Sequence, residues 1–269
     1  MTGYDESNYS HTPRILLFDI ECTPMLGYTW GKWQQNVLKF TEDWWMLSFA
    51  YRWYGTNEKV KVRSLPMFPG YEDDLKNDEH LVKEMWELMN EADIVIAHNG
   101  DKFDVKKVNA RFAVHGLPRP TPGQSVDTLK VARQSFAFSS NSLNDLGQFL
   151  DLGQKLSHAG FDLWLGCMAG EKKSWKIMEA YNKQDVVLLE QVYERFKKDG
   201  WIPRHPDIAI LSGINNGCPI CGSTERVKNG FYPTTAYRYQ KYICKNDECQ
   251  HHYRSAFAEP GSRSSYRRI

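Results

Sequence analysis

The sequence predicts an α/β fold in which helices flank a mixed β-sheet, with a small metal-binding segment after it. Three observations predict this. Strand patterns at residues 14–22 and 47–65, followed by alternating helical and strand patterns from residue 81, place parallel strands beside antiparallel ones. Four cysteines within residues 218–249 then indicate a separate unit stabilised by a metal ion.

The first predicted strand carries two acidic side chains. Residues 14–22 read R-I-L-L-F-D-I-E-C, an apolar run too short for a helix and rich in β-formers, which predicts a buried central strand. Because side chains alternate along a strand, Asp19 and Glu21 project from the same face. Two adjacent carboxylates repel each other unless a cation or a shared proton neutralises them, which suggests a metal. A strand that simply ends in solvated charge is the alternative.

The next segments extend the predicted sheet. A Trp-rich connection follows the first strand and is long enough for a loop that covers a substrate. Alternating patterns at residues 47–54 and 59–65, separated by G-T-N-E, predict an antiparallel hairpin beside the first strand. Amphipathic spacing at residues 81–89 predicts a helix, and I-V-I-A-H-N at residues 94–99 predicts a strand parallel to its neighbour.

The sequence from residue 104 to residue 198 is mainly helical in pattern. The expected elements, in order, are a helix at 104–115, a short strand or turn at 126–132 that enters a helix, a helix N-capped by Asn141 or Ser142, a Gly-rich loop at 153–170 and a long helix at about 174–198.

Length and composition indicate a folded chain. Its 269 residues, 41% hydrophobic and 13% aromatic, are enough for one substantial core and a small appendage. No apolar run approaches a membrane span, and M-T-G-Y-D-E-S lacks the regions of a signal peptide, so we expect a cytoplasmic protein without a membrane partner. The net charge is +1, but residues 201–269 carry 10 Lys and Arg against 5 Asp and Glu. This end of the chain is therefore basic.

Two more carboxylates are expected near Asp19. Asp104 follows H-N-G-D-K-F, which runs off the end of a strand, where open α/β sheets place their sites. Asp104 or Asp101 could instead cap the next helix. Asp185 lies in the apolar stripe of the last long helix, where a bare carboxylate costs roughly several kcal/mol unless it is paired, protonated or metal-bound. Pairing with an Arg or a Lys is the alternative for Asp185.

The four carboxylates of Asp19, Glu21, Asp104 and Asp185 form an all-oxygen set, which suits Mg²⁺ or Mn²⁺ and is poor for zinc. Two such ions about 3.5 to 4 Å apart stabilise both the attacking and the leaving oxygen in phosphoryl transfer. The sequence therefore predicts a nuclease with two divalent ions.

Three motifs resemble those of a known family. D-I-E at residues 19–21, N-x-x-x-F-D at residues 99–104 and Y-x-x-x-D at residues 181–185 are similar, in order, to the exonuclease motifs of the DEDD superfamily of 3′-5′ exonucleases. The tyrosine places the chain nearest the DEDDy branch, which includes proofreading domains of DNA polymerases. The resemblance implies a ribonuclease H-like fold, with three antiparallel strands followed by parallel ones. Stand-alone bacteriophage exonucleases, several with a C-terminal zinc ribbon, are the most similar, and a phage-encoded protein would work in the host cytoplasm.

The resemblance also implies roles for the acidic residues and the tyrosine. Asp19 would bind both metal ions, Glu21 and Asp185 would complete the site that holds the nucleophilic water, and Asp104 would bind the second ion. Tyr181 would orient that water, since a phenol with a reference pKa of about 10 is a poor base near neutrality.

Neighbouring residues are expected to contact the substrate. The family pattern places Asn99 and Phe103 near the terminal nucleotides, although Phe103 is equally consistent with an ordinary core position. His98 is more consistent with a hydrogen-bonded structural histidine, because Tyr181 already fills the water-orienting role. Asp101 has no assigned role.

The cysteine spacing predicts a zinc ribbon. C-x2-C and C-x4-C pairs separated by 22 residues suit a four-thiolate tetrahedral site formed by Cys218, Cys221, Cys244 and Cys249. Disulfides are the alternative. We expect one structural Zn²⁺, without which so small a segment would not fold.

Basic and aromatic residues alternate between the two cysteine pairs, as at Arg238, Tyr239, Lys241 and Tyr242. This mixture offers phosphate contacts and stacking surfaces for a single strand. A solvated surface with hydrophobic residues that stabilise a tiny unit is the alternative, and replication or repair proteins are the other expected partners.

The predicted organisation is a flexible N-terminus at 1–13, an exonuclease domain at 14–199, a linker at 200–216, a zinc ribbon at 217–257 and a basic tail at 258–269.

The expected function is metal-dependent hydrolysis of single-stranded nucleic acid, DNA favoured over RNA, from the 3′ end to nucleoside 5′-monophosphates. The alternatives are a nucleic-acid-binding zinc-ribbon adaptor on an inactive nuclease fold, or an RNA exonuclease or an endonuclease on the same fold. The intact carboxylate set favours the enzyme, because an inactive relative is free to lose one of them.

Overall fold

A computed structural model describes residues 11–33, 36–121, 123–157, 160–203 and 205–264 of the chain. The chain divides into two units, one of residues Arg14–Tyr193 and one that contains Glu194–Ile269. The domain boundaries drawn from the sequence stay predictions, and most of the N-terminus expected to be flexible, with the end of the basic tail, lies outside the described residues.

A five-stranded mixed sheet forms the centre of the first unit, in the order β5-β4-β1-β6-β7. Its strands are β1 (Ile15–Cys22), β4 (Met46–Trp53), β5 (Lys61–Ser64), β6 (Ile94–Ala97) and β7 (Gln124–Asp127). Strands β1, β4 and β5 are antiparallel, whereas β6 is parallel to β1 and β7 is parallel to β6. The predicted mixed sheet, with antiparallel strands first and parallel strands later, is confirmed.

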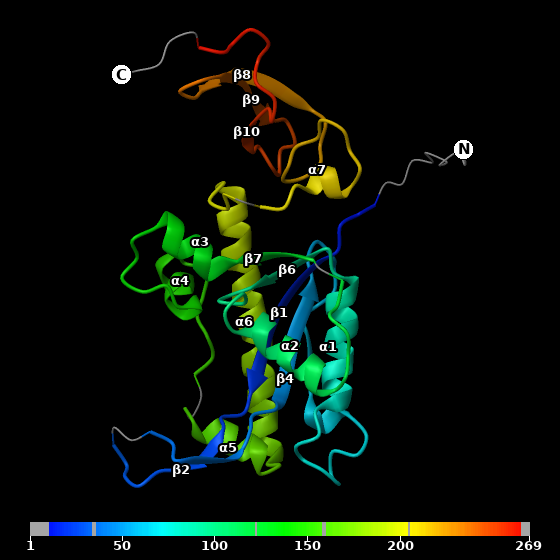
Figure 1. Cartoon of the computed structure of the whole chain (residues 1–269), viewed down its shortest axis with the longest axis vertical. Coiled ribbons are helices and arrows are strands. Elements are labelled where there is room, and N and C mark those ends of the chain that lie inside the picture. Colours follow the sequence, from blue (N-terminus) through cyan, green and yellow to red (C-terminus); the bar gives the residue numbers. More distant parts are fainter. Residues whose placement is uncertain (1–10, 34–35, 122, 158–159, 204, 265–269) are drawn as a thin grey trace, which may run out of the picture. The chain divides into compact units, whose positions relative to one another are not determined.

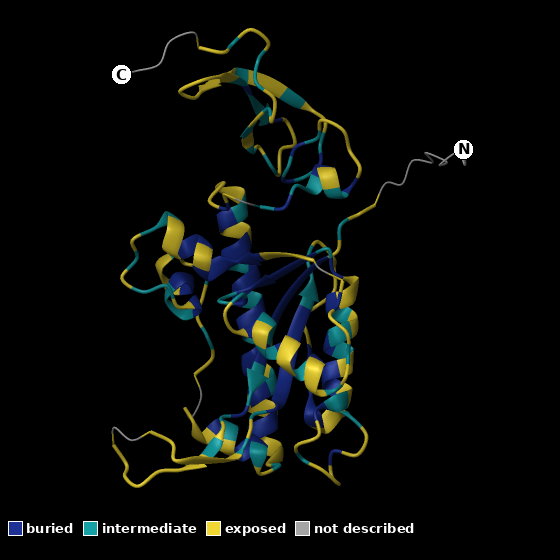
Figure 2. Cartoon of the chain, in the orientation of Figure 1, coloured by how far each residue is buried: buried dark blue, intermediate teal, exposed yellow. Residues whose placement is uncertain are grey.

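Strand β1 is central and buried on both faces. Leu16, Leu17 and Phe18 are fully buried, and β4 and β6 pair with its two edges. An almost continuous apolar run is what a strand covered by helices on both sides requires. Figure 2 shows this burial along the strands of the sheet.

Helices cover both faces of the sheet (Figure 1). Leu16 and Phe18 of β1 belong to one core cluster with Met85 of α1 (Glu79–Glu91) and Phe112 of α2 (Asp104–Val114). The alternate face of β1 meets α6 (Lys172–Lys198), whose Asn182 donates a hydrogen bond to Asp19. Asp19 and Glu21 therefore point toward the long helix.

Three shorter helices connect β7 to α6: α3 (Thr128–Ser135), α4 (Leu143–Phe149) and α5 (Asp162–Met168). Ser142 is the N-cap of α4, with its hydroxyl accepting from the amide of Asp145 at 3.2 Å, so the second of the two predicted caps is confirmed. Helix α5 was not predicted, because it lies inside the segment expected to be a Gly-rich loop. The Trp-rich connection also contains structure, the two-stranded hairpin β2 (Leu26–Tyr28) and β3 (Lys39–Glu42). A single 3-10 turn, η1 (Leu65–Met67), follows β5.

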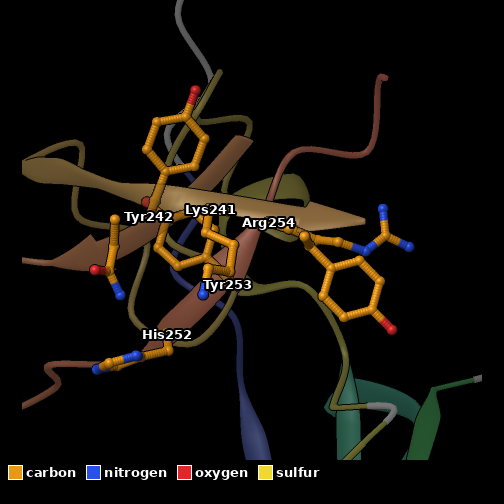
Figure 3. A pocket seen from close by; sticks show the side chains of 7 residues that line it. Lys241, Tyr242, His252, Tyr253 and Arg254 are labelled. Carbon is orange, nitrogen blue, oxygen red and sulfur yellow. The ribbon is translucent and has the colours of Figure 1, made fainter. Parts of the chain in front are cut away.

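The second unit contains a three-stranded antiparallel sheet in the order β10-β9-β8. Its strands are β8 (Arg226–Pro233), β9 (Arg238–Cys244) and β10 (His252–Arg254), and a short helix, α7 (Ile208–Leu211), lies in the segment predicted as a linker. Side chains of β9 and β10 line a pocket on this sheet (Figure 3). Among the helices of the described residues, none combines the length and apolar composition needed to cross a bilayer.

Candidate active site

Asp19, Glu21 and Asp185 come together from two elements. Asp19 and Glu21 lie on β1 and Asp185 lies on α6, and one carboxylate oxygen from each lies within 4.8 Å of the other two. Asn182 fixes this contact, because its amide nitrogen donates to Asp19 Oδ2 at 2.7 Å while its oxygen accepts from Ser48 at 3.1 Å. The position of Asp19 on the central strand is thus locked to the long helix.

Asp104 reaches the same strand from α2. It is the first residue of that helix and is 3% exposed, and its Oδ1 accepts from the backbone amide of Ile20 at 3.3 Å. Ile20 lies between Asp19 and Glu21, and the charge of Asp104 raises the pKa of both of these acids, so Asp104 lies near the cluster although it is not among the three residues whose oxygens lie within 4.8 Å of one another. Asp104 does not cap the helix, because the N-cap is Phe103 and makes no side-chain capping bond.

Burial and mutual repulsion disfavour the ionised form of these acids. The pKa of Asp19 is raised by burial and then by the charges of Asp104, Glu21 and Asp185. Burial, followed by Asp185, raises the pKa of Glu21 to about 8, and burial raises the pKa of Asp104 to about 7. A divalent cation would reverse these shifts by favouring the charged form. Clustered hard oxygen donors therefore fit Mg²⁺ or Mn²⁺.

Tyr181 and Asp185 share a cation that the sequence did not reveal. The Nζ of Lys155 lies 2.6 Å from Asp185 Oδ2 and donates to the Tyr181 hydroxyl at 3.2 Å. Burial lowers the pKa of Lys155, but the charges of Asp185, Tyr181 and Asp19 together outweigh burial and raise it. Burial and then Asp185 raise the pKa of Tyr181. The ion pair considered for Asp185 exists, and it lies within the acidic cluster. No periodic pattern marked Lys155, which lies in the connection between α4 and α5.

Of the residues expected to contact substrate, Asn99 lines a cavity and Phe103 is exposed. Asn99 has a left-handed backbone (φ 66°) and lines an open cavity of about 750 Å³ together with Lys155 and Arg133. Phe103 is 42% exposed, so the core position considered for it is wrong. His98 hydrogen-bonds Thr128 at 2.9 Å and the Asn141 carbonyl at 3.0 Å, and burial lowers the pKa of His98 to about 4.

Asp127 organises the loop that carries Asn99. It is the N-cap of α3, where its Oδ1 accepts from the amide of Leu129 at 3.0 Å, and the same atom accepts from the amide of Asn99 at 2.9 Å. The only indication of this role in the sequence is the position of Asp127 just before a predicted helix. Asp101 lies outside the acidic cluster, where it pairs with Lys130 and accepts from Ser125 at 2.7 Å.

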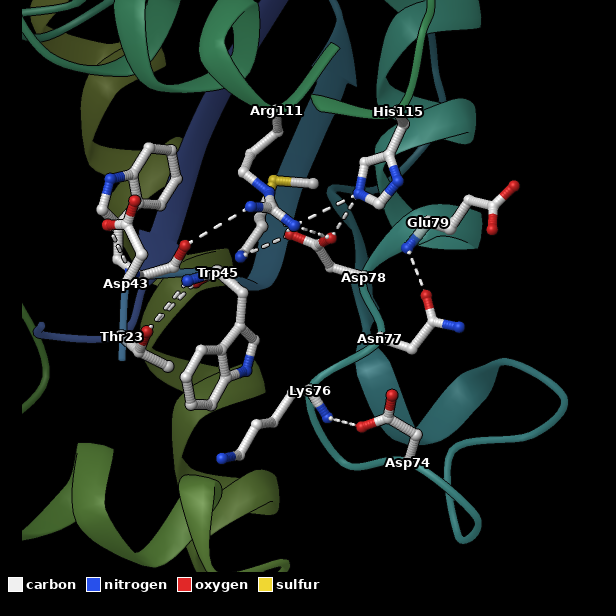
Figure 4. A network of polar contacts seen from close by, with 12 residues as sticks. Thr23, Asp43, Trp45, Asp74, Lys76, Asn77, Asp78, Glu79, Arg111 and His115 are labelled. Carbon is white, nitrogen blue, oxygen red and sulfur yellow. Dashed lines mark hydrogen bonds and ion pairs between the residues drawn. The ribbon is translucent and has the colours of Figure 1, made fainter. Parts of the chain in front are cut away.

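A buried ion-pair network anchors α2, which carries Asp104 (Figure 4). Asp78, just before α1, has no exposed surface. Its carboxylate accepts hydrogen bonds from Arg111 Nε at 2.7 Å and from His115 Nε2 at 2.7 Å. Its Oδ2 also accepts from the amide of Met46 at 2.8 Å, at the start of β4. One carboxylate thus joins α1, α2 and the sheet.

The four predicted zinc ligands also converge. One sulfur from each of Cys218, Cys221, Cys244 and Cys249 lies within 4.8 Å of the others, with 3.8 Å between the first and last and 3.6 Å between the middle two. A tetrahedral site with Zn–S bonds of about 2.3 Å has edges of about 3.8 Å, so the sulfur positions fit zinc. All four are free thiols, which contradicts the disulfide alternative.

Comparison with known proteins supports the fold. No curated protein matches the sequence. Of 170 matching chains among solved structures, one is the family B DNA polymerase from the hyperthermophilic archaeon Pyrobaculum calidifontis, at 14% identity and a TM-score of 0.51. The match covers 77% of this chain and 26% of that chain, so the protein spans about a quarter of the polymerase, and the likeness is one of fold.

A family model described as RNase_H superfamily matches residues 53–197. The match includes Asp104, Tyr181 and Asp185, whereas Asp19 and Glu21 precede it. Because this region exceeds half of the 269 residues, the chain belongs to the RNase H superfamily.

Proposed function

We propose that the protein is a divalent-metal-dependent 3′-5′ exonuclease that degrades single-stranded nucleic acid to nucleoside 5′-monophosphates. One observation carries the proposal. The carboxylates of Asp19, Glu21 and Asp185, from β1 and α6, lie together in a member of the RNase H superfamily, and Asp104 of α2 is bonded to the backbone between the first two. The single ammonium group of Lys155 does not balance four carboxylates, so the cluster is costly to maintain without further cations, which supports a catalytic rather than a structural role.

Two Mg²⁺ or Mn²⁺ ions are the proposed cofactors, held by Asp19, Glu21, Asp104 and Asp185. When bound, they supply an activated water and stabilise charge on the phosphate oxygens. The chain itself contributes orientation. The hydroxyl of Tyr181 is held by Lys155, and with its pKa raised by burial it stays protonated and positions water as a hydrogen-bonding group.

Several features support a 3′-terminal, single-stranded substrate. The order of the three motifs is similar to that of 3′-5′ exonucleases. Phe103 is exposed next to Asp104, where its ring can stack on an unpaired base. Asn99, Arg133 and Lys155 line one cavity and offer hydrogen bonds and positive charge to a phosphate. The structural likeness to a DNA polymerase makes DNA the first substrate to test.

The test uses a 5′-labelled single-stranded oligonucleotide with Mg²⁺ or Mn²⁺. We expect stepwise shortening from the 3′ end, reduced by more than about a hundredfold in Asp19→Asn or Asp185→Asn. Asp101→Asn is the matched control. Asp101 lies three residues before Asp104 but pairs with Lys130, so this variant should keep most of the activity. Binding without shortening in the parent protein would instead support the adaptor.

Matched DNA and RNA oligonucleotides, together with a circular single strand, define the substrate. We expect faster shortening of DNA than of RNA and no cleavage of the circle, because an exonuclease needs a free end. Cleavage of the circle would replace the proposal with an endonuclease.

A further inference from the structure

The sheet of the second unit has one face that does not carry the zinc ligands. Side chains alternate along β9, so Tyr239 and Lys241 point away from the face that holds the ligand Cys244. Tyr232 of β8 is paired with Tyr239, and Arg254 of β10 is paired with Lys241. Two tyrosines and two cations from three strands therefore share this face.

A bulge in β8 shapes the face. The pairing of β8 with β9 shifts between Lys228 and Phe231, which leaves Asn229 and Gly230 without cross-strand partners. Gly230 has φ +70°, and its carbonyl accepts from the buried side chain of Gln240 at 2.8 Å. This contact holds the bulge in place. Bulges of this kind redirect neighbouring side chains.

A pocket of about 310 Å³ opens on this sheet (Figure 3). Its volume is at the lower end of the range of about 300 to 1,000 Å³ for ligand sites. Its lining includes Tyr232, Lys241, His252 and Arg254 of this face, together with Asn229, Tyr242 and Tyr253. None of its described lining residues is a carboxylate, so the pocket has a positive character.

One cation of the pocket, Arg254, is held against aromatic rings. The guanidinium carbon of Arg254 lies 4.3 Å from the centre of the Tyr239 ring and 5.3 Å from that of Tyr232. Within the described part of the chain, neither Lys241 nor Arg254 forms an ion pair with a carboxylate. Both charges thus remain available to an external anion, and Tyr232, at 48% exposure, offers a ring face beside them.

We propose that this face, defined by Tyr232, Tyr239, Lys241 and Arg254, binds single-stranded nucleic acid. A base stacks on the ring of Tyr232, and the flanking phosphates contact Lys241 and Arg254. The combination of stacking surface and unpaired cations matches the way in which proteins hold single strands without reading sequence. A partner protein would need apolar anchors at the centre of the face, where the structure instead places two cations. The site is separate from the carboxylate cluster and does not depend on hydrolysis.

The test measures fluorescence anisotropy of a labelled oligo-dT bound to the full chain carrying Asp19→Asn, which prevents its degradation. Lys241→Ala with Arg254→Ala should weaken binding by about tenfold, because two phosphate contacts are lost. The slope of log K against the logarithm of the salt concentration should become less steep by about 1.4. Tyr232→Ala should weaken binding by about fivefold or more, whereas Tyr232→Phe, which keeps the ring, should not.

Controls separate the face from general charge and from folding. Lys59→Ala with Lys61→Ala removes the same charge from exposed positions of the first unit and should leave binding unchanged. Each variant must retain one zinc ion per chain. Unchanged affinity and unchanged salt dependence in both face variants would overturn the proposal and point to a protein partner.

Hydrolysis of a dinucleotide distinguishes this proposal from the exonuclease assignment. In a background with Asp19 intact, the face variants should cleave the dinucleotide at the parent rate, because so short a substrate needs no second contact. A parent protein that binds oligo-dT through this face but cleaves nothing would refute the exonuclease and leave the binding face standing.

Discussion

Among single residues, Lys155 brings a positive charge into the acidic cluster. Its ammonium group lies 2.6 Å from Asp185 and 3.2 Å from the Tyr181 hydroxyl, and the Lys155 side chain is 29% exposed while that of Asp185 is 1% exposed. Removing one partner of a buried ion pair is destabilising, because it leaves the other charge uncompensated. Lys155 therefore stabilises the cluster in the absence of divalent ions.

Lys155→Met should destabilise the protein in buffer free of divalent ions. We expect a loss of about 2 kcal/mol, less than for a fully buried pair, which corresponds to a thermal midpoint lower by about 4 to 8 °C. Added Mg²⁺ should narrow the difference, because the ion supplies the missing charge. Thermal unfolding with and without Mg²⁺ checks this, with Lys183→Met on the exposed surface of α6 as control. An equal loss in both conditions would contradict this role.

The acidic residues could be predicted from the sequence, whereas Lys155 could not. Asp19, Glu21 and Asp185 interrupt apolar patterns, so the free-energy cost of burying their carboxylates can be recognised from the sequence alone. Lys155 lies in a segment with no periodicity, and its partner Asp185 is 30 positions further along the chain. Its contact depends on the path of the chain between α4 and α5, which no local pattern specifies.

At the scale of elements, the position of α2 depends on the contact between Asp78 and Arg111. Asp78 is fully buried and accepts from Arg111, His115 and the amide of Met46. The side chain of Arg111 is 15% exposed. By contrast, the pair of Arg63 and Glu84 lies near the surface, with side chains 35% and 27% exposed.

Arg111→Met should cost about 3 to 5 kcal/mol of unfolding free energy, because it leaves the charge of Asp78 buried without its main partner. The matched variant Arg63→Met should cost less than about 1 kcal/mol, since solvent screens its pair. Equilibrium unfolding in urea compares the two. Equal costs would show that burial does not set the strength of the Asp78 network.

Elements with strong apolar patterns were predicted well, and α5 shows why others were missed. Strands β1, β4 and β6 and helix α6 lie within about two residues of their predicted ends. The glycines within residues 153–170 favoured a loop at the position where α5 forms. In the structure Gly166 lies inside α5, and a Cβ there would come within 2.1 Å of Ser174 Oγ near the start of α6. This glycine serves close packing between helices, a tertiary requirement that composition does not show.

At the scale of the molecule, the two units have different sources of stability. The first has an extensive apolar core, whereas the buried cluster around Cys218 and Cys244 in the second is small. Units with so little core usually need a metal. The second unit should therefore depend on zinc and the first should not.

Removal of zinc should unfold the second unit selectively. After treatment with a zinc chelator, limited proteolysis should cut within residues 205–264, while residues 14–193 stay resistant, because the first unit keeps its extensive apolar core and the second has little core without its metal. Modification of the thiols should release one zinc ion per chain. A cleavage pattern that does not change after zinc removal would contradict the prediction.

The tethered ammonium group near Asp185 also affects the electroneutrality of the catalytic pocket under the proposed function. Two divalent ions would cancel four ionised carboxylates on their own. With Lys155 included, the ensemble carries a surplus of one positive unit, equal and opposite to the charge of one phosphodiester. Under the proposed function this surplus would attract the anionic backbone of a nucleic acid, and Arg133, which lines the same cavity as Lys155, would add to the attraction.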